Sequence, residues 1–284
     1  MKKLTVAGVP EHFNLPWHLA IDQGIFQELG VDLRWQDFSD GTGAMMRAAA
    51  NQEVDIALVL TEGAIAHITQ NQSTRMVGTW VESPLVWGVH SGPHTKKGPH
   101  YPHDGRVAIS RYGSGSHLMP LVHAHQASYD QPLQFVEIGN LPSALQAFEE
   151  DRVDTFYWER TMTVPQVQAG QLVLDGDFQA PWPAFVGVRA GGPEEANDDA
   201  WATVLLAMGA FMPKLLADPE AFLAQVSQKY DLPAEETQTW FERTAWAPKL
   251  DVDAEAIGRA QEALLHAGAI EKRLDHRDLL WDRG

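Results

Sequence analysis

The sequence contains no cysteine among its 284 residues. This absence excludes disulfide bonds, metal sites built from thiolates and catalysis by a cysteine nucleophile. It leaves the redox compartment undetermined, because proteins of either compartment can lack cysteine.

Long apolar runs are also missing. No stretch approaches the roughly 20 apolar residues that a membrane-spanning helix needs, so we expect no membrane insertion. The apolar run that follows Lys2-Lys3 stops at Pro10, which is too short for the core of an export signal. We therefore expect a cytoplasmic protein, or a periplasmic one if an export signal has been removed.

Positive charge is scarce. The 21 Lys and Arg residues are outnumbered by 38 Asp and Glu residues, which gives a formal net charge of −17, and no basic stretch is longer than Lys96-Lys97. A surface this acidic repels the phosphate backbone of nucleic acids and anionic lipid. We expect no nucleic-acid partner.

The chain does contain enough apolar material for two domains. Hydrophobic residues make up 44% of it, and its length exceeds the usual size of a single core. Thr5–Val9 and Arg106–Ser110 are short apolar runs of strand type. Each leads through a loop into a helical pattern, one beginning near Pro16 and the other covering His117–His125.

A second pair of segments supports an internal repeat. Gly43–Ala50 and Pro142–Glu149 are helical patterns that lead through polar turns into the apolar strands Val54–Leu58 and Val153–Tyr157, each of which begins with Val-Asp. Strands that alternate with helices predict parallel βαβ units. Two such sets predict two similar α/β lobes.

The remaining segments differ in composition. Ser91–Asp104, rich in Gly, Pro, His and Lys, predicts an exposed connection between the lobes. Beyond the breaker Gly191-Gly192-Pro193 the pattern is mostly helical, and we expect these helices to pack on the first lobe: Trp201–Leu216, Pro219–Tyr230, Ala234–Thr244 and Asp253–Ala267. The predicted organisation is lobe 1 over residues 1–90, lobe 2 over residues 91–186, and a return to lobe 1 with C-terminal helices over residues 187–284.

Four segments carry a resemblance to a known family. The first is Pro10–Phe26, a loop that leads into a helix ending Ala-Ile-Asp-Gln-Gly-Ile-Phe, and the others follow in the family's order: Glu53–Ala57, Gly113–Ser116 and Val153-Asp154. They resemble the type II periplasmic binding proteins, nearest the nitrate, sulfonate and taurine binders and the thiamine-pyrimidine synthase-like branch. This superfamily has intracellular members in bacteria and fungi. The resemblance implies a two-lobed α/β clamshell that closes on a small organic ligand in the cleft between the lobes, with a C-terminal helical segment packed on lobe 1.

Loops at the carboxyl ends of the strands line the cleft in that family, as is general for open α/β sheets. The first such loop, Glu11-His12-Phe13-Asn14, combines a carboxylate, an imidazole, an aromatic face and an amide, which suit a polar heterocycle. The other interpretation is an exposed turn that caps the next helix. Phe13 favours a binding site, because a solvated turn gives no reason for a phenylalanine.

The loop Gly113-Ser114-Gly115-Ser116, flanked by Ser110 and His117, precedes a helix. The N–H groups and the dipole at a helix start can hold an anion or a carbonyl oxygen. No Gly-Lys-Ser/Thr follows, so this is not a nucleotide-binding loop. On the motif alone, an ordinary helix cap with flexible glycines explains it equally well.

Two pairs follow equivalent strands of the two lobes and are candidates to face each other across the cleft: Thr61-Glu62 and Trp158-Glu159. These carboxylates, together with Glu11, favour a cationic or amine-bearing ligand. Trp158 or Trp182 would add a cation–π face. The alternative is that the glutamates begin solvated helices and the tryptophans belong to the core.

We predict no metal site, although the chain has 12 histidines. The four histidines that crowd one connection, His90, His94, His100 and His103, lack the spacing of ligands on one helix face. We also predict no cofactor.

Enzyme chemistry is disfavoured, and we predict no catalytic residue. Thiamine-pyrimidine synthase-like enzymes carry a histidine that aligns with Asn14 here, and their cysteine-rich motif is absent. No Gly-x-Ser-x-Gly marks a serine hydrolase. We therefore expect a solute-binding protein or an intracellular metabolite-binding protein. The alternatives left open are a thiamine-pyrimidine synthase-like enzyme and a ligand-dependent sensor that acts on a protein partner, and any transporter or regulatory partner is unidentified.

Overall fold

The computed structural model describes residues 1–95, 105–129, 131–190 and 198–281. The chain divides into two compact units, each built from separate stretches of sequence. Unit 1 consists of Met1–Ser83, Trp182–Gly258 and Leu274–Gly284, and unit 2 consists of Pro84–Pro181 and Arg259–Arg273.

Unit 1 contains a six-stranded sheet in the order β11-β4-β10-β3-β1-β2. Its strands are β1 (Lys2–Gly8), β2 (Val31–Asp37), β3 (Ile56–Leu60), β4 (Thr74–Val81), β10 (Phe185–Ala190) and β11 (Trp246–Lys249). The first three are parallel, with Val6 opposite both Trp35 and Ile56. Strand β10 runs antiparallel to β3 and β4, and β11 runs antiparallel to β4.

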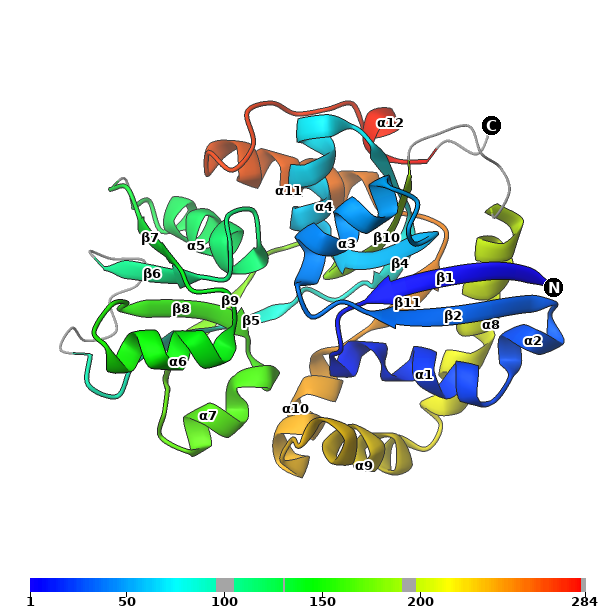
Figure 1. The fold of residues 1–284 in the computed structure, drawn as a ribbon, viewed down its shortest axis with the longest axis horizontal. Coiled ribbons are helices and arrows are strands. Elements are labelled where there is room, and N and C mark those ends of the chain that lie inside the picture. The colour runs from blue at the N-terminus through cyan, green and yellow to red at the C-terminus, as the bar shows by residue number, and fades with distance from the viewer. Residues whose placement is uncertain (96–104, 130, 191–197, 282–284) are drawn as a thin grey trace. The chain divides into compact units, whose positions relative to one another are not determined.

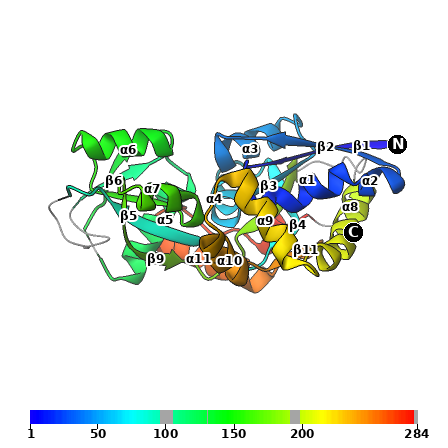
Figure 2. The same cartoon turned by 90° about the horizontal axis from the view of Figure 1, so that it is seen from below.

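The helices of unit 1 cover both faces of this sheet. They are η1 (His12–Asn14), α1 (Leu15–Asp22), α2 (Ile25–Glu28), α3 (Gly41–Ala50), α4 (Thr61–Asn71), α8 (Asp198–Leu215), α9 (Pro219–Tyr230), α10 (Ala234–Arg243) and α12 (His276–Leu279). Helices α3 and α4 pack together on the face opposite α1 (Figure 1). Helices α9 and α10 lie side by side, as Figure 2 also shows.

The core of unit 1 is rich in tryptophan. Trp17 on α1 is fully buried, and its ring centroid lies 5.1 Å from that of Trp80 and 6.1 Å from that of Trp201. Proline stands in the first turn of α1, where no intrahelical partner is needed for its missing N–H. Gly24, with a φ of 71°, turns the chain between α1 and α2.

Unit 2 contains a five-stranded sheet in the order β7-β6-β8-β5-β9. Its strands are β5 (Val86–Ser91), β6 (Arg106–Ile109), β7 (Gln134–Glu137), β8 (Thr155–Glu159) and β9 (Val173–Gln179), and its helices are α5 (Gly115–Gln126), α6 (Leu141–Glu149), η2 (Thr161–Thr163) and α7 (Val164–Gln168). Helix α11 (Ala254–His266) contains the boundary between the units. Ala108, Ala147 and Phe156 belong to a buried cluster between the sheet and α6.

The internal repeat has a physical counterpart in both units. The carboxylate of Asp55 accepts a hydrogen bond from the backbone N–H of Thr5 at 2.7 Å, and the carboxylate of Asp154 accepts one from the N–H of Arg106 at 2.7 Å. The backbone N–H of each aspartate in turn donates to the carbonyl of the same strand residue. The repeated Val-Asp is therefore the element that joins the third strand of each βαβ set to its first strand. The predicted fold of two similar α/β lobes is confirmed.

The predicted helices of the C-terminal half agree closely with α8 to α11, but the unit boundaries differ from the predicted lobes. The chain leaves unit 1 at Ser83, so β5 and residues 91–95 of the predicted connection belong to unit 2, and residues 96–104 of that connection lie outside the described residues. The chain returns at Trp182. Helices α8, α9 and α10 belong to unit 1, whereas Arg259–Arg273 belong to unit 2 and not, as expected, to lobe 1.

No single helix in the described part of the chain is long and apolar enough to span a membrane. The consecutive helices α8 and α9 pass that test only when taken as a pair, and they are bent by 106°.

Candidate functional site

Within each unit, the predicted site residues lie at the carboxyl edge of the parallel strands. In unit 1 the loop Glu11–Asn14 follows β1, and Thr61-Glu62 follows its neighbour β3. In unit 2 the segment Ser110–His117 follows β6, and Trp158-Glu159 ends the neighbouring β8. This edge is the usual place for ligands in open α/β folds.

The loop after β1 is packed into unit 1. His12, Phe13 and Asn14 are buried, whereas Glu11 is half-buried. The His12 ring centroid lies 4.4 Å from that of Trp240 and 4.6 Å from that of Phe13. Burial lowers the pKa of His12 to about 3, so this imidazole is neutral at physiological pH.

Asn14 organises this loop and does not cap α1 with its side chain. Its amide Nδ2 donates to the carbonyl of Val9 at 2.8 Å, and its Oδ1 accepts from the indole Nε1 of Trp80 at 3.2 Å. The loop is therefore neither the exposed turn nor the open polar surface that the sequence suggests. Glu11 is its most accessible polar group.

Thr61 and Glu62 begin α4 and contact the segment around Trp182. The Thr61 hydroxyl donates to the carbonyl of Pro183 at 2.5 Å, and the indole Nε1 of Trp182 donates to Oε2 of Glu62 at 3.0 Å. All three predicted site residues are buried. Burial raises the pKa of Glu62 to about 7, against smaller lowering effects of a backbone hydrogen bond and the indole.

Glu159 and Glu62 do not occupy equivalent positions. Glu159 is the last residue of β8, whereas Glu62 is the second residue of α4. Its Oε2 accepts the backbone N–H of Met162 at 2.7 Å. Burial raises the pKa of Glu159 to about 7. Trp158 is half-buried against the core of unit 2, and its ring stacks on Phe156 at 5.0 Å.

Three buried serines meet at the start of α5. The Ser116 hydroxyl accepts the backbone N–H of Ser110 at 2.9 Å and donates to the Ser110 hydroxyl at 3.3 Å. The Ser114 hydroxyl lies 3.0 Å from that of Ser116 and donates to the carbonyl of Arg111 at 2.7 Å. The sequence predicts all three as site residues from their place beside the start of the helix.

The start of α5 lacks the side-chain cap that α6 has. Asn140 caps α6 by accepting the backbone N–H of Ser143 at 3.0 Å. Ser114 occupies the equivalent position of α5 but makes no such bond, and its hydroxyl donates to the carbonyl of Arg111. The first N–H groups of a helix have no acceptor within the helix. Those of Gly115 and Ser116 are thus suited to an external anion.

The neighbouring loop adds an aromatic residue that sequence reasoning missed. Tyr112 is 63% exposed, and its ring centroid lies 5.0 Å from that of His117. Gly113, with a φ of 80°, turns the backbone so that its N–H donates to Nδ1 of His117 at 3.1 Å. Burial lowers the pKa of His117. An aromatic residue directly before a Gly-Ser loop was the signal that would have identified Tyr112.

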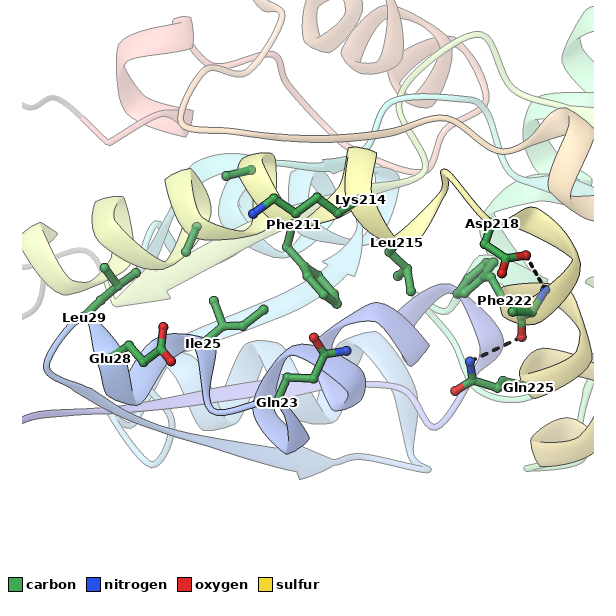
Figure 3. A pocket seen from close by; sticks show the side chains of 13 residues that line it. Gln23, Ile25, Glu28, Leu29, Phe211, Lys214, Leu215, Asp218, Phe222 and Gln225 are labelled. Atoms are coloured by element: carbon green, nitrogen blue, oxygen red, sulfur yellow. Dashed lines mark hydrogen bonds between the residues drawn. The ribbon is translucent and has the colours of Figure 1, made fainter.

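Unit 1 also has a shallow groove of about 620 Å³ between α2, α8 and α9 (Figure 3). Ile25, Phe211 and Phe222 supply apolar surface, and Glu28 and Lys214 supply charge. The groove residues on α2 precede the amino-terminal end of β2, so the groove does not lie at the carboxyl edge of the strands where the predicted site residues are. None of the predicted site residues lines it.

No three histidine or acidic side chains in the described ranges are grouped so that they could hold a metal ion. His90 is buried, with its Nε2 2.9 Å from the Thr163 hydroxyl, and burial lowers its pKa to about 4. His100 and His103 lie outside the described residues.

Comparison with known proteins supports the fold. Residues 87–172 match the model of the Ca3427-like PBP family. The structure is similar to that of the Candida albicans CA3427 gene product, described as exhibiting the generic periplasmic binding protein fold, with a TM-score of 0.91 and 24% identity over 97% of this chain and 93% of that chain. No curated protein sequence matches.

Two sulfonate-binding proteins share the fold at lower identity. The periplasmic aliphatic sulphonate binding protein SsuA of Escherichia coli has a TM-score of 0.74 and 17% identity, over 99% of this chain and 98% of that chain. The alkanesulfonate-binding protein SsuA of Xanthomonas axonopodis pv. citri, bound to MOPS, has a TM-score of 0.78 and 13% identity, over 99% of this chain and 98% of that chain.

The chain has the two-lobed α/β fold of the periplasmic binding proteins. The resemblance in sequence predicted this fold, and residues 87–172 are the part of the chain that matches a family model. The segment that matches the Ca3427-like PBP family lies within unit 2.

Proposed function

We propose that this chain binds a small organic molecule between its two units and closes on it. The ligand presents an oxyanion, such as a sulfonate or a carboxylate, to the start of α5. One observation carries this proposal: Ser114 leaves the first N–H groups of α5 without a side-chain cap, beside the hydroxyl of Ser116. N–H groups and hydroxyls that converge at a helix start favour negative charge.

Two relatives support this choice of group. The sulphonate binder of Escherichia coli and the MOPS-bound protein of Xanthomonas axonopodis pv. citri share the fold of this chain. Because identity to them is 17% and 13%, the fold supports the binding mode, and the residues of α5 supply the reason for an oxyanion.

The amine or nitrogen heterocycle favoured by the sequence fits the rest of the ligand. Glu62 and Glu159 are weaker sites for a cation than the sequence suggests, because both are buried and have a pKa near 7. Half-buried Glu11 and the exposed ring of Tyr112 are better placed to meet an amine or a heterocycle. MOPS carries both a sulfonate and a tertiary amine and is therefore the first compound to test.

A thermal-shift screen tests the proposal. The panel contains MOPS, alkanesulfonates, amino acids, polyamines, pyrimidines and thiazoles. A ligand at a hundred times its Kd adds about 2.7 kcal/mol to the native state and raises the midpoint by roughly 5–10 °C. We expect hits among compounds with a sulfonate or carboxylate. Hits confined to polyamines would contradict the oxyanion, and a hit that is chemically converted would favour the enzyme alternative.

The Ser116→Ala variant tests the place of binding. It removes one hydroxyl from the start of α5, and we expect titration calorimetry to show about tenfold weaker binding of the best anionic hit, or weaker still, since hydrogen bonds to charged groups are worth about 1.5–3 kcal/mol. Ser143→Ala, in the first turn of α6, is the matched control and should bind as the parent does. Equal affinity in both variants would move the ligand away from α5.

A further inference from the structure

The two segments where the chain first leaves unit 1 and then returns to it are rich in proline. We call Ser83-Pro84 and Pro181–Pro183 the crossing segments, because the unit boundaries fall within them. Proline has no N–H and a fixed φ, so these segments offer few donors for a sheet ladder. Other contacts must hold them in place.

The crossing segments are tied to each other within unit 1. The backbone N–H of Ala184, directly after the second segment, donates to the carbonyl of Ser83 at 3.1 Å. Phe185 then begins β10 opposite Val81, close to the end of β4. A shift of one segment is therefore passed to the other.

The start of α4 makes three hydrogen bonds to the second crossing segment and to Ala184 directly after it. The N–H of Thr61 donates to the carbonyl of Ala184 at 3.1 Å, and its hydroxyl donates to the carbonyl of Pro183 at 2.5 Å. The indole N–H of Trp182 donates to Glu62 at 3.0 Å. The indole bond is the only one of these three that fixes a side chain of the segment.

This bond is buried on both sides. Trp182 is 3% exposed and Glu62 is 2% exposed, so the indole N–H is shielded from water and Glu62 is its acceptor. A buried donor that loses its acceptor bears its full desolvation cost. The orientation of Trp182, and with it the path of the chain at the boundary, thus depends on the Glu62 side chain.

We propose that Glu62 is a positioning residue of the hinge, which sets the balance between open and closed arrangements of the two units through Trp182 and does not contact the ligand. This inference rests on the proposed function, because it takes closure as the motion that is controlled. It replaces the role of a ligand carboxylate that the sequence suggests for Glu62.

The absence of cysteine allows a direct test on the ligand-free protein. Cysteines introduced at the exposed positions Gln27 in unit 1 and Glu149 in unit 2 can carry spin labels without background. Pulsed electron paramagnetic resonance then gives the distribution of distances between the labels. It is recorded for the labelled parent and for labelled Glu62→Gln, Glu62→Ala and Trp182→Phe variants.

Glu62→Gln keeps an acceptor oxygen for the indole, so its distance distribution should match that of the parent. Glu62→Ala and Trp182→Phe each remove the bond, and we expect about a tenfold change in the ratio of the distance populations. The matched control is Trp201→Phe, which removes a buried indole bond to the carbonyl of Val77 at 3.2 Å, away from the crossing segments. It should lose stability and keep the parent distribution.

The proposal would be overturned if Glu62→Ala and Trp182→Phe both kept the distance distribution of the parent while their thermal midpoints fell as in Trp201→Phe. Glu62 would then have a purely structural role. That result would leave the proposed function intact, since the screen for ligands and the Ser116→Ala titration do not involve the hinge. Binding that weakens in Glu62→Gln, with an unchanged distribution, would instead restore Glu62 as a ligand contact.

Discussion

At the scale of single residues, the candidate carboxylates lie in the interior of the protein. Glu62 and Glu159 are both buried without a positively charged group as the main influence, and burial raises the pKa of each to about 7. Hydrogen bonds from Trp182 and from the backbone of Met162 offset part of this cost. Both groups therefore titrate close to physiological pH.

The raised pKa values predict a loss of stability with rising pH. Between about pH 4.5 and 7 the native state keeps protons on Glu62 and Glu159 that the unfolded chain releases, so the free energy of unfolding falls as pH rises through this window. The fall is on the order of 3 kcal/mol per group. Urea unfolding at pH 5 and pH 8 should show a smaller fall in a Glu62→Gln, Glu159→Gln double variant than in the parent.

An exposed control, Glu149→Gln, should retain the fall of the parent. If the double variant shows the same difference between pH 5 and pH 8 as the parent, the two carboxyl groups do not have raised pKa values in the native protein.

The sequence indicates which residues follow the strands, but not how they are used. Trp182 and Glu62 are far apart in the chain, and their bond exists only after β10 has paired with β3. Likewise, Asn14 is a plausible cap by its type, yet its amide is taken by Val9 and Trp80. Side-chain partners of this kind depend on tertiary packing, which local patterns do not contain.

At the scale of elements, the repeat shows why a short motif recurs. Gln52 and Asp151 adopt φ values of 58° and 51°, and each lies two residues after the end of a helix and two residues before the Val-Asp of its unit. The aspartate then holds the first strand of its set through Thr5 or Arg106. The Val-Asp signal was visible in the sequence because both copies need the same hydrogen bond.

Removing this carboxylate should destabilise either unit. Asp55→Ala and Asp154→Ala each leave a backbone N–H without its side-chain acceptor, which costs about 1–3 kcal/mol. We expect faster amide exchange at Thr5 in the first variant and at Arg106 in the second, measured by hydrogen–deuterium exchange. Asn in place of either aspartate keeps an acceptor oxygen and should preserve most of the protection. Unchanged exchange in both alanine variants would show that the shared bond carries no stability.

Elements with strong local signals could be predicted and weak ones could not. Helices α9 and α10 begin at or after Pro219 and Pro233, which mark helix starts in the sequence. Strand β11 was not predicted, because its four residues include Pro248 and it pairs only at the edge of the sheet beside β4.

At the scale of the whole molecule, the two similar sets of βαβ units made the fold class predictable. The unit boundaries could not be predicted, because two antiparallel strands each belong to a different unit from the one that their place in the chain suggests. Strand β5 follows β4 closely but pairs with β8 and β9 of unit 2, and β10 pairs with β3 and β4 of unit 1. Such pairings depend on contacts between residues that are far apart in the sequence, which local patterns do not reveal.

At the scale of the whole molecule we also propose that the two units close on a small anionic molecule. The most direct test is the label-to-label distance between introduced cysteines at Gln27 and Glu149, measured by pulsed electron paramagnetic resonance with and without the best anionic compound from the screen. We expect a saturating concentration of ligand to shift the distance distribution to one narrow population. The shift should disappear in Ser116→Ala at a concentration that saturates only the parent. A compound that binds tightly and leaves the distribution unchanged would contradict closure.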